Sequence, residues 1–226
     1  MDLLSPIWKA ARYAADSGEA AKALDIIREG STSYADAQNY AYHVGKALSD
    51  ALTGNLSSAV LPGGKMTEKL AEEIVRTILE EGHGMVSDAA VMVQNALNSS
   101  AGIGLKAQKA ALNESRIKGI ISRLVGAENF DDIAWILGDP VVNFSMAVAD
   151  ETLRRNMEFQ GKAGLKPVLI RKAPRKCCEW CNNLAGAYEY PDVPDDVYRR
   201  HENCRCTVEY DPGTGRKQNV HTKQWR

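Results

Sequence analysis

The first 176 residues of the sequence contain no cysteine, although five cysteines follow between Cys177 and Cys206. No apolar run approaches the roughly 20 residues that a membrane-spanning helix needs. The N-terminus also lacks the basic start and apolar core of a signal peptide. These absences predict a protein that has no membrane span and stays in a reducing cytoplasm, where cysteines are more suited to metal binding than to disulfides.

Sequence signatures of catalysis are also missing. No motif provides a phosphate-binding glycine loop, a nucleophile elbow or a Ser/His/Asp set. The composition is ordinary for a globular protein, with 44% hydrophobic and 25% charged residues. A chain of 226 residues is long enough for one full-sized domain and a smaller appendage.

Residues 1–161 have the pattern of a helical body. Between 34 and 48, apolar side chains recur at steps of three and four residues, which is the period of one helix face. Loops are expected at 30–33, 61–64, 82–84 and 98–104 because glycine, serine and proline gather there. Later helices are expected at 106–124, 131–137 and 139–161. The sequence therefore predicts a mainly α fold with a multi-helix N-terminal body.

The character of the chain changes after Gly161–Gly164. Short strands are expected at 168–171 and 206–210, with a region rich in Cys, Pro and Asp between them. We therefore expect a small C-terminal α+β module at residues 162–211, followed by a basic flexible tail at residues 212–226. The charge changes sign at the same place. Residues 1–161 hold 15 Lys and Arg against 21 Asp and Glu, and residues 162–226 hold 13 against 8.

The module carries a pattern that is typical of zinc binding. Cys178 and Cys181 form a Cys-x2-Cys pair, and a second group with His201, Cys204 and Cys206 follows at a distance. Zinc prefers four thiolate or imidazole ligands at tetrahedral corners, and two such groups on separate turns can supply them. The sequence therefore predicts one structural Zn2+ per chain.

Five candidates compete for four ligand positions. Cys178, Cys181 and Cys204 are the best supported, and the fourth ligand is either His201 or Cys206. His201 repeats the spacing of the first pair, whereas Cys206 would share a strand face with Cys204.

Cys177 is expected to be a spare thiol. Three alternatives to a structural zinc site remain for the whole cluster. They are free buried cysteines, a strained disulfide, and a catalytic zinc with Glu179 or Glu202 as general base. Acids beside zinc ligands are more often solvated surface residues, so a structural site is favoured.

The string from Arg171 to Asp211 resembles the phage head morphogenesis proteins, also called Mu F-like minor capsid proteins. The resemblance rests on Cys178-Glu-Trp-Cys181, on Leu184-x-Gly186 and above all on His201-Glu-Asn-Cys204-Arg205-Cys206. The chain differs from the common form in having Glu202 where proline is frequent. The resemblance covers about the last third of the chain.

This resemblance implies a non-enzymatic component of the virion or procapsid, present in few copies near the portal. The implied partners are phage portal, capsid or scaffold proteins. The implied location is the host cytoplasm during assembly and then the phage head. Packaged DNA is a further possible partner, through the basic C-terminal region.

Two other functions compete with this one. A zinc-ribbon protein that binds nucleic acid would use the basic residues around the metal site, which are Arg171, Lys172, Arg175, Lys176, Arg199, Arg200 and Arg205. A zinc-dependent hydrolase is the less favoured alternative.

Overall fold

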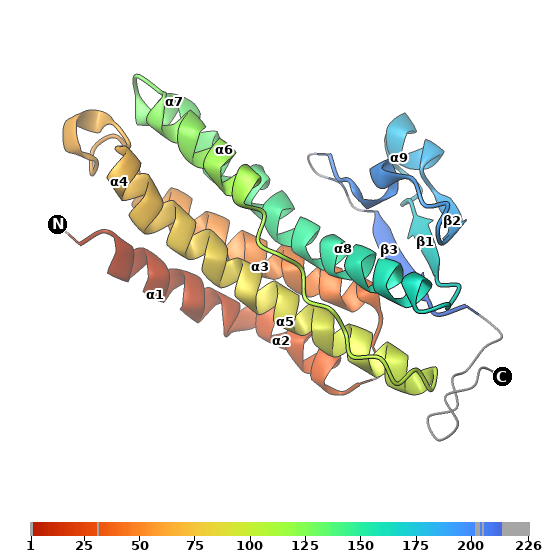
Figure 1. The fold of residues 1–226 in the computed structure, drawn as a ribbon. Coiled ribbons are helices and arrows are strands. Elements are labelled where there is room, and N and C mark those ends of the chain that lie inside the picture. Colours follow the sequence, from red (N-terminus) through yellow and green to blue (C-terminus); the bar gives the residue numbers. More distant parts are fainter. Residues whose placement is uncertain (1, 31, 202–203, 205, 214–226) are drawn as a thin grey trace.

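The protein is an elongated bundle of helices with a small sheet packed beside one end (Figure 1). The computed structural model describes residues 2–30, 32–201, 204 and 206–213, so the tail expected beyond 213 lies outside the described residues. The described helices of the body are α1 (Leu4–Ala15), α2 (Gly18–Arg28), α3 (Tyr34–Asn55), η1 (Pro62–Gly64), α4 (Glu68–Leu70), η2 (Ala71–Arg76), α5 (Thr77–Ser100), α6 (Glu114–Val125), α7 (Phe130–Ile133), η3 (Ala134–Leu137) and α8 (Asp139–Lys162). The mainly α fold with a small C-terminal sheet is confirmed.

Helix α3 is the central helix of the bundle and packs against α1, α2, α5 and α8. Two glycines set how closely its neighbours approach. A Cβ at Gly45 of α3 would lie 2.8 Å from the Cα of Val142 in α8. A Cβ at Gly82 of α5 would overlap the side chain of Leu48 in α3. Both glycines therefore permit close helix packing.

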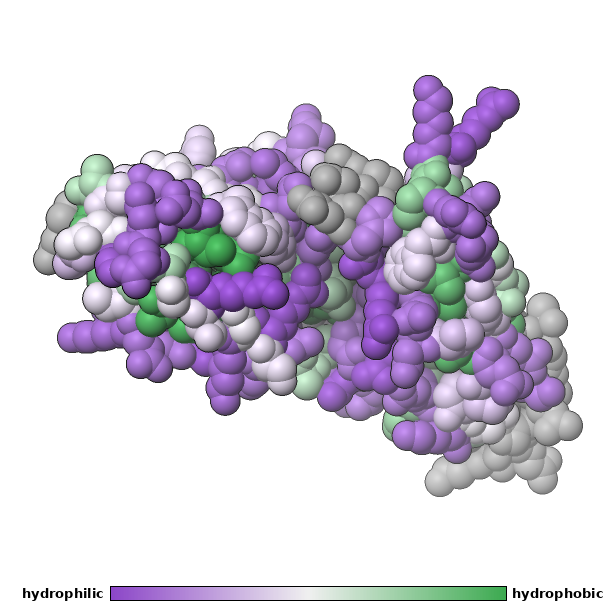
Figure 2. All heavy atoms as spheres, turned by 90° about the horizontal axis from the view of Figure 1, so that it is seen from above, coloured by the Kyte–Doolittle hydropathy of each residue, from purple (hydrophilic) through white to green (hydrophobic). Residues whose placement is uncertain are grey.

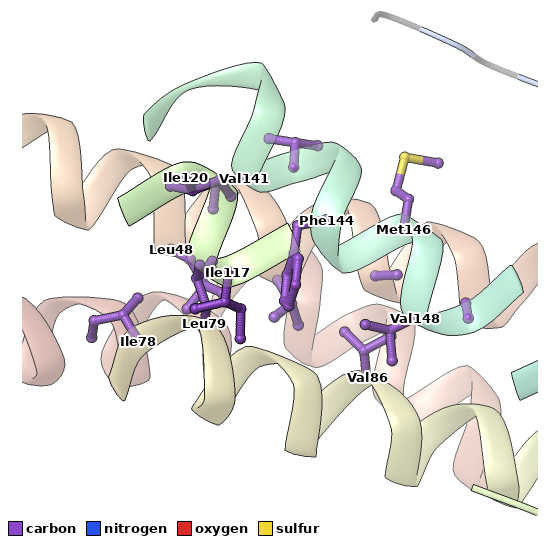
Figure 3. Close-up of a cluster of buried hydrophobic side chains, with 14 of the residues drawn as sticks. Leu48, Ile78, Leu79, Val86, Ile117, Ile120, Val141, Phe144, Met146 and Val148 are labelled. Carbon is purple, nitrogen blue, oxygen red and sulfur yellow. The ribbon is translucent and has the colours of Figure 1, made fainter. Parts of the chain in front are cut away.

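The prediction of a loop at residues 82–84 is wrong. Helix α5 runs from Thr77 to Ser100 without a break. The glycine that indicated a loop in the sequence is required by the contact with Leu48 instead, because tertiary packing offsets the low helix propensity of glycine. Figure 3 shows Leu48 in the apolar cluster that α3 forms with side chains of α5, α6 and α8.

The helix expected at 106–124 begins only at Glu114. The connection before it runs along α5 and α8 without helical structure (Figure 1). Asparagine side chains of α5 and α8 form hydrogen bonds with backbone groups of this connection. Asn156 accepts from the N–H of Gln108 at 2.7 Å and donates to its carbonyl at 2.8 Å. Asn95 accepts from the N–H of Ala107 at 3.0 Å. These long-range hydrogen bonds replace those of a helix.

The C-terminal module contains a three-stranded antiparallel sheet in the order β2-β1-β3. The central strand β1 (Val168–Lys172) and the outer strand β3 (Thr207–Asp211) confirm the two expected strands, and β2 (Gly186–Glu189) was not predicted. Along the chain, a short helix α9 (Glu179–Asn183) lies between β1 and β2, and a 3-10 turn η4 (Asp195–Tyr198) lies between β2 and β3.

The module and the helical body share one apolar core. Leu169, Val197, Val208 and Tyr210 of the module belong to the same buried cluster as the helices. At the end of α8, Gly161 lies so close to the ring of Tyr190 that a Cβ would overlap it. The sheet is therefore held directly against the bundle.

Polar contacts between the module and the body are also buried. The amide of Gln38 in α3 bonds both backbone groups of Val208 in β3, at 3.0 and 3.1 Å. Arg200 forms an ion pair with Asp150 of α8, and both side chains are 2% exposed. Among the residues that the structure describes, no helix is long and apolar enough to cross a membrane.

Candidate metal centre

The first ligand pair lies at the start of α9. Cys178 is the residue before the helix, and its Sγ accepts a hydrogen bond from the backbone N–H of Cys181 at 3.4 Å. This hydrogen bond favours the thiolate and lowers the pKa of Cys178. Cys181 follows one turn later and is buried, whereas Cys178 is exposed. The local fold thus brings both sulfur atoms to the same side of a tight turn.

The second group lies on the segment that leads into β3. The backbone N–H of Cys204 donates to the carbonyl of His201 at 3.2 Å, which closes a turn between them. Cys206 directly precedes β3. Cys204 and Cys206 are both buried, and with Cys181 they form a small cluster separate from the main apolar core.

The two groups converge, as the sequence predicted. Cys178, Cys181 and His201 form one triple of candidate ligand atoms within 4.8 Å of one another, and Cys181, Cys204 and Cys206 form another. Cys181 belongs to both triples. All five candidate ligands therefore lie around one place, and the geometry is consistent with a metal-ion site.

The sulfur–sulfur distance between two thiols of the cluster suits a tetrahedral ion. The Sγ atoms of Cys181 and Cys204 are 3.7 Å apart. Zinc–sulfur bonds of about 2.3 Å would place two tetrahedral thiolates roughly 3.8 Å apart. The Nε2 atom of His201 lies 3.2 Å from the Sγ of Cys178 and 2.9 Å from that of Cys181. The donor set of thiolates and imidazole favours zinc over calcium or magnesium, which prefer oxygen ligands.

A buried arginine gives independent support for a negatively charged centre. Arg171 of β1 is 2% exposed, and its Nη2 lies 3.9 Å from the Sγ of Cys181 and 3.8 Å from that of Cys204. Its Nη1 donates to the carbonyls of Val197 and Arg199. Among the described residues it has no carboxylate partner. A buried cation without a counter-charge is costly, so the cluster beside it is the expected source of negative charge.

Without a metal ion, the thiols are a poor source of the negative charge that Arg171 needs. Burial raises the pKa of Cys206, and burial also raises the pKa of Cys181, so these groups favour the neutral form in the absence of a metal. Bound zinc deprotonates its thiol ligands. Three thiolates and one imidazole around Zn2+ carry a net charge of −1, which Arg171 would balance. The residues present therefore fit a zinc ion.

Arg171 is the site residue whose role the sequence reasoning missed. It was assigned to a basic surface, but it lies on the buried face of β1 together with Leu169. Trp180 of α9 packs over its guanidinium group, with 5.3 Å to the ring centroid. The alternation of Leu169 and Arg171 along the strand is the signal that could have placed both on the inner face.

Two other residues named from the sequence lie at the edge of the site. Cys177 is partly exposed and belongs to neither triple, and its Sγ lies 3.8 Å from the side-chain oxygen of Asn182. Glu179 is exposed in the first turn of α9. Glu202 lies outside the described residues.

The basic residues around the module do not form one free surface. Arg171 is buried, the side chain of Arg200 is 2% exposed, and Lys172 pairs with Glu209 at 2.7 Å. Arg175 and Lys176 are exposed. Arg205 lies outside the described residues. Two of the seven side chains named for nucleic-acid binding are therefore unavailable to a phosphate backbone.

Comparison with protein-family models found no match, and comparisons with curated proteins and with solved structures found none either.

Proposed function

We propose that this chain is a phage minor capsid or head morphogenesis protein, a structural component of the virion or procapsid near the portal. The observation that carries the proposal is the convergence of Cys178-Glu-Trp-Cys181 with the His201, Cys204 and Cys206 segment at the end of a helical body. The same strings carry the resemblance to that family. The role is structural, and the chain is not an enzyme.

The proposed cofactor is one structural Zn2+ per chain, held by Cys178, Cys181, His201 and Cys204. The turn from His201 to Cys204 and the turn at α9 each supply two ligands. This set gives a centre of charge −1, which the cation of Arg171 balances, whereas four thiolates would give a charge of −2. Cys206 is then a buried neighbour of the ion.

The purpose of the ion is to fix the module. Four buried apolar residues of the module belong to the core of the helices, and the cysteine cluster is a small core of its own. Zinc binding supplies on the order of 10 kcal/mol of apparent free energy in small units of this kind, which offsets the entropy of ordering their backbone. Of the two acids considered as a general base, Glu179 is the one that the structure describes, and its exposed position supports the structural role.

The proposed partners are the portal, capsid or scaffold proteins, with packaged DNA a further candidate at the basic C-terminal region. The proposed location is the host cytoplasm during assembly and then the phage head.

Mass spectrometry of purified particles tests this function. Particles from the phage or induced prophage that encodes the chain should contain it at a small fraction of the abundance of the major capsid protein. The Cys181→Ser variant should be missing from the particles, and the Cys177→Ser variant should be incorporated normally. Absence of the unaltered chain from both procapsids and virions would contradict the proposal.

A further inference from the structure

Cys206 is a fifth donor in a cluster that offers zinc four ligand positions. The zinc set proposed above does not use its thiol, although Cys206 is as deeply buried as the ligands Cys181 and Cys204. The Sγ atoms of these three cysteines lie within 4.8 Å of one another. The thiol of Cys206 is therefore within reach of an ion that Cys181 and Cys204 bind.

The backbone holds Cys206 in this position. Its carbonyl accepts a hydrogen bond from the Nη1 of Arg200 at 2.7 Å, and Arg200 in turn forms the buried ion pair with Asp150. The next residue, Thr207, begins β3 and pairs with Lys172 of β1. Because the cysteine cluster is separate from the main apolar core, the thiol of Cys206 is fixed among other sulfur atoms.

His201 is the ligand that a fourth thiolate can replace. It is the one nitrogen donor among the five candidates, and its Nε2 lies 3.2 Å from the Sγ of Cys178 and 2.9 Å from that of Cys181. Bonds of about 2.3 Å to sulfur and about 2.0 Å to nitrogen would separate these atoms by roughly 3.5 Å around a tetrahedral ion. A tetrahedral ion therefore requires His201 to move away from these sulfur atoms, whereas Cys181 and Cys204 already have the required spacing of 3.7 Å.

The softness of the ion decides between His201 and Cys206. Zinc accepts imidazole as well as thiolate, and the set with His201 keeps the charge of the centre at −1 beside Arg171. Cd2+ is a larger and softer divalent ion, and soft ions prefer thiolate to imidazole. Four thiolates around Cd2+ carry a charge of −2, of which Arg171 balances one. The stronger bond of the soft ion to sulfur offsets the remaining charge.

We propose that Cys178, Cys181, Cys204 and Cys206 form a second ligand set, which binds the thiophilic divalent ion Cd2+ without a bond from His201. The proposal rests on the zinc centre proposed above, since the two sets share three cysteines. Hydrophilic side chains dominate the molecular face shown in Figure 2, whereas three of these four cysteines are buried and Cys178 is exposed. An incoming ion therefore meets Cys178 before the buried thiols.

The first test loads the full, unaltered chain with an NMR-active isotope of cadmium and asks which side chains are bonded to the ion. Scalar coupling to the metal should appear for the β-protons of Cys178, Cys181, Cys204 and Cys206, and it should be absent for the ring protons of His201. Coupling to the His201 ring, or the lack of coupling to Cys206, would overturn the proposal. This measurement does not depend on the folding of a variant.

The second test compares the affinities of three variants for the two ions by competition with a chromogenic chelator. Cys206→Ser should lower the affinity for Cd2+ by at least about tenfold, since even the loss of a ligand's hydrogen-bond partner costs about 10–100-fold, and it should leave the affinity for zinc unchanged. His201→Gln should lower the affinity for zinc and leave that for Cd2+ unchanged. Cys177→Ser is the control, because Cys177 belongs to neither triple, and it should change neither affinity.

The outcomes separate this proposal from the zinc centre. Equal losses for the two ions in Cys206→Ser would overturn the proposal. The expected zinc affinities together with coupling of cadmium to His201 would overturn this proposal alone. A chain that binds neither ion would contradict the zinc centre and this proposal together.

Discussion

The side-chain amide of Gln38 bonds the backbone of Val208 in both directions, as a neighbouring β-strand would. Its Nε2 donates to the carbonyl at 3.0 Å, and its Oε1 accepts from the N–H at 3.1 Å. The same Nε2 also donates to Asp150 at 2.9 Å. A residue of α3 thereby covers an edge of the sheet and links it to the buried ion pair of α8.

This relationship predicts a large effect of Gln38→Leu, which keeps the volume and removes the hydrogen bonds. The variant leaves both backbone groups of Val208 without their buried partner, at a cost of about 1–3 kcal/mol each. We expect the free energy of unfolding to fall by about 2–4 kcal/mol, as measured by urea denaturation. The matched control is Gln108→Leu, because within the described part of the chain the side-chain amide of Gln108 bonds only the carbonyl of Lys106. Equal losses in the two variants would show that Gln38 does not anchor the sheet.

The ion pair between Asp150 and Arg200 predicts a second effect. Both side chains are 2% exposed, so Asp150→Asn leaves a buried guanidinium group without its counter-charge. We expect a loss of about 3–5 kcal/mol in the free energy of unfolding. Asp50→Asn removes the exposed pair with Lys46 and should cost less than about 1 kcal/mol. An effect of Asp150→Asn no larger than this control would contradict the interpretation.

The position of Arg171 beside the thiols predicts that its substitution lowers the affinity for zinc and leaves the helices intact. Arg171→Gln removes the positive charge and the N–H donors that face the sulfur atoms of Cys181 and Cys204. The affinity for zinc, measured by competition with a chromogenic chelator, should fall by about 10–100-fold. Lys172→Gln is the control, since Lys172 is exposed and pairs with Glu209. If both variants bind zinc as the unaltered chain does, Arg171 is not the counter-charge of the centre.

A truncation that removes the module measures how far the fold of the helical body depends on it. Residues 1–161 alone should retain a helical circular dichroism spectrum, because α3, α5 and α8 keep their mutual core. Their melting temperature should be lower than that of the full chain, since Val208 and Tyr210 no longer cover the body core. Loss of the helical signal would show that the module is required for the helices to form.

The sequence predicted the helical class, two of the three strands and the set of candidate ligands, because each depends on a local pattern. The periodicity of α3 and the spacing of Cys178 and Cys181 are visible within a few residues. The break expected at Gly82 was wrong because the reason for that glycine lies on α3, at Leu48. The alternation along β1 could have indicated the burial of Arg171, but its role beside the thiols could not be predicted, since Cys181 and Cys204 are separated from it by ten residues or more.

The connection before α6 illustrates the same limit. Residues 106–113 have the composition of a helix, but the side chains of Asn95 and Asn156 bond their backbone from other helices. Local propensity is weak compared with such tertiary contacts. Charge pairing between distant residues, as for Asp150 and Arg200, likewise has no signature in the sequence.

The most direct test of the account is native mass spectrometry of the full chain and of its single cysteine variants. The unaltered chain, Cys177→Ser and Cys206→Ser should each carry one zinc ion. Cys181→Ser and Cys204→Ser should lose the ion, together with the protease resistance of residues 165–211, while their helical signal remains. A folded, metal-free monomer of the unaltered chain, with the module still resistant to protease, would contradict the central claim that zinc holds this module together.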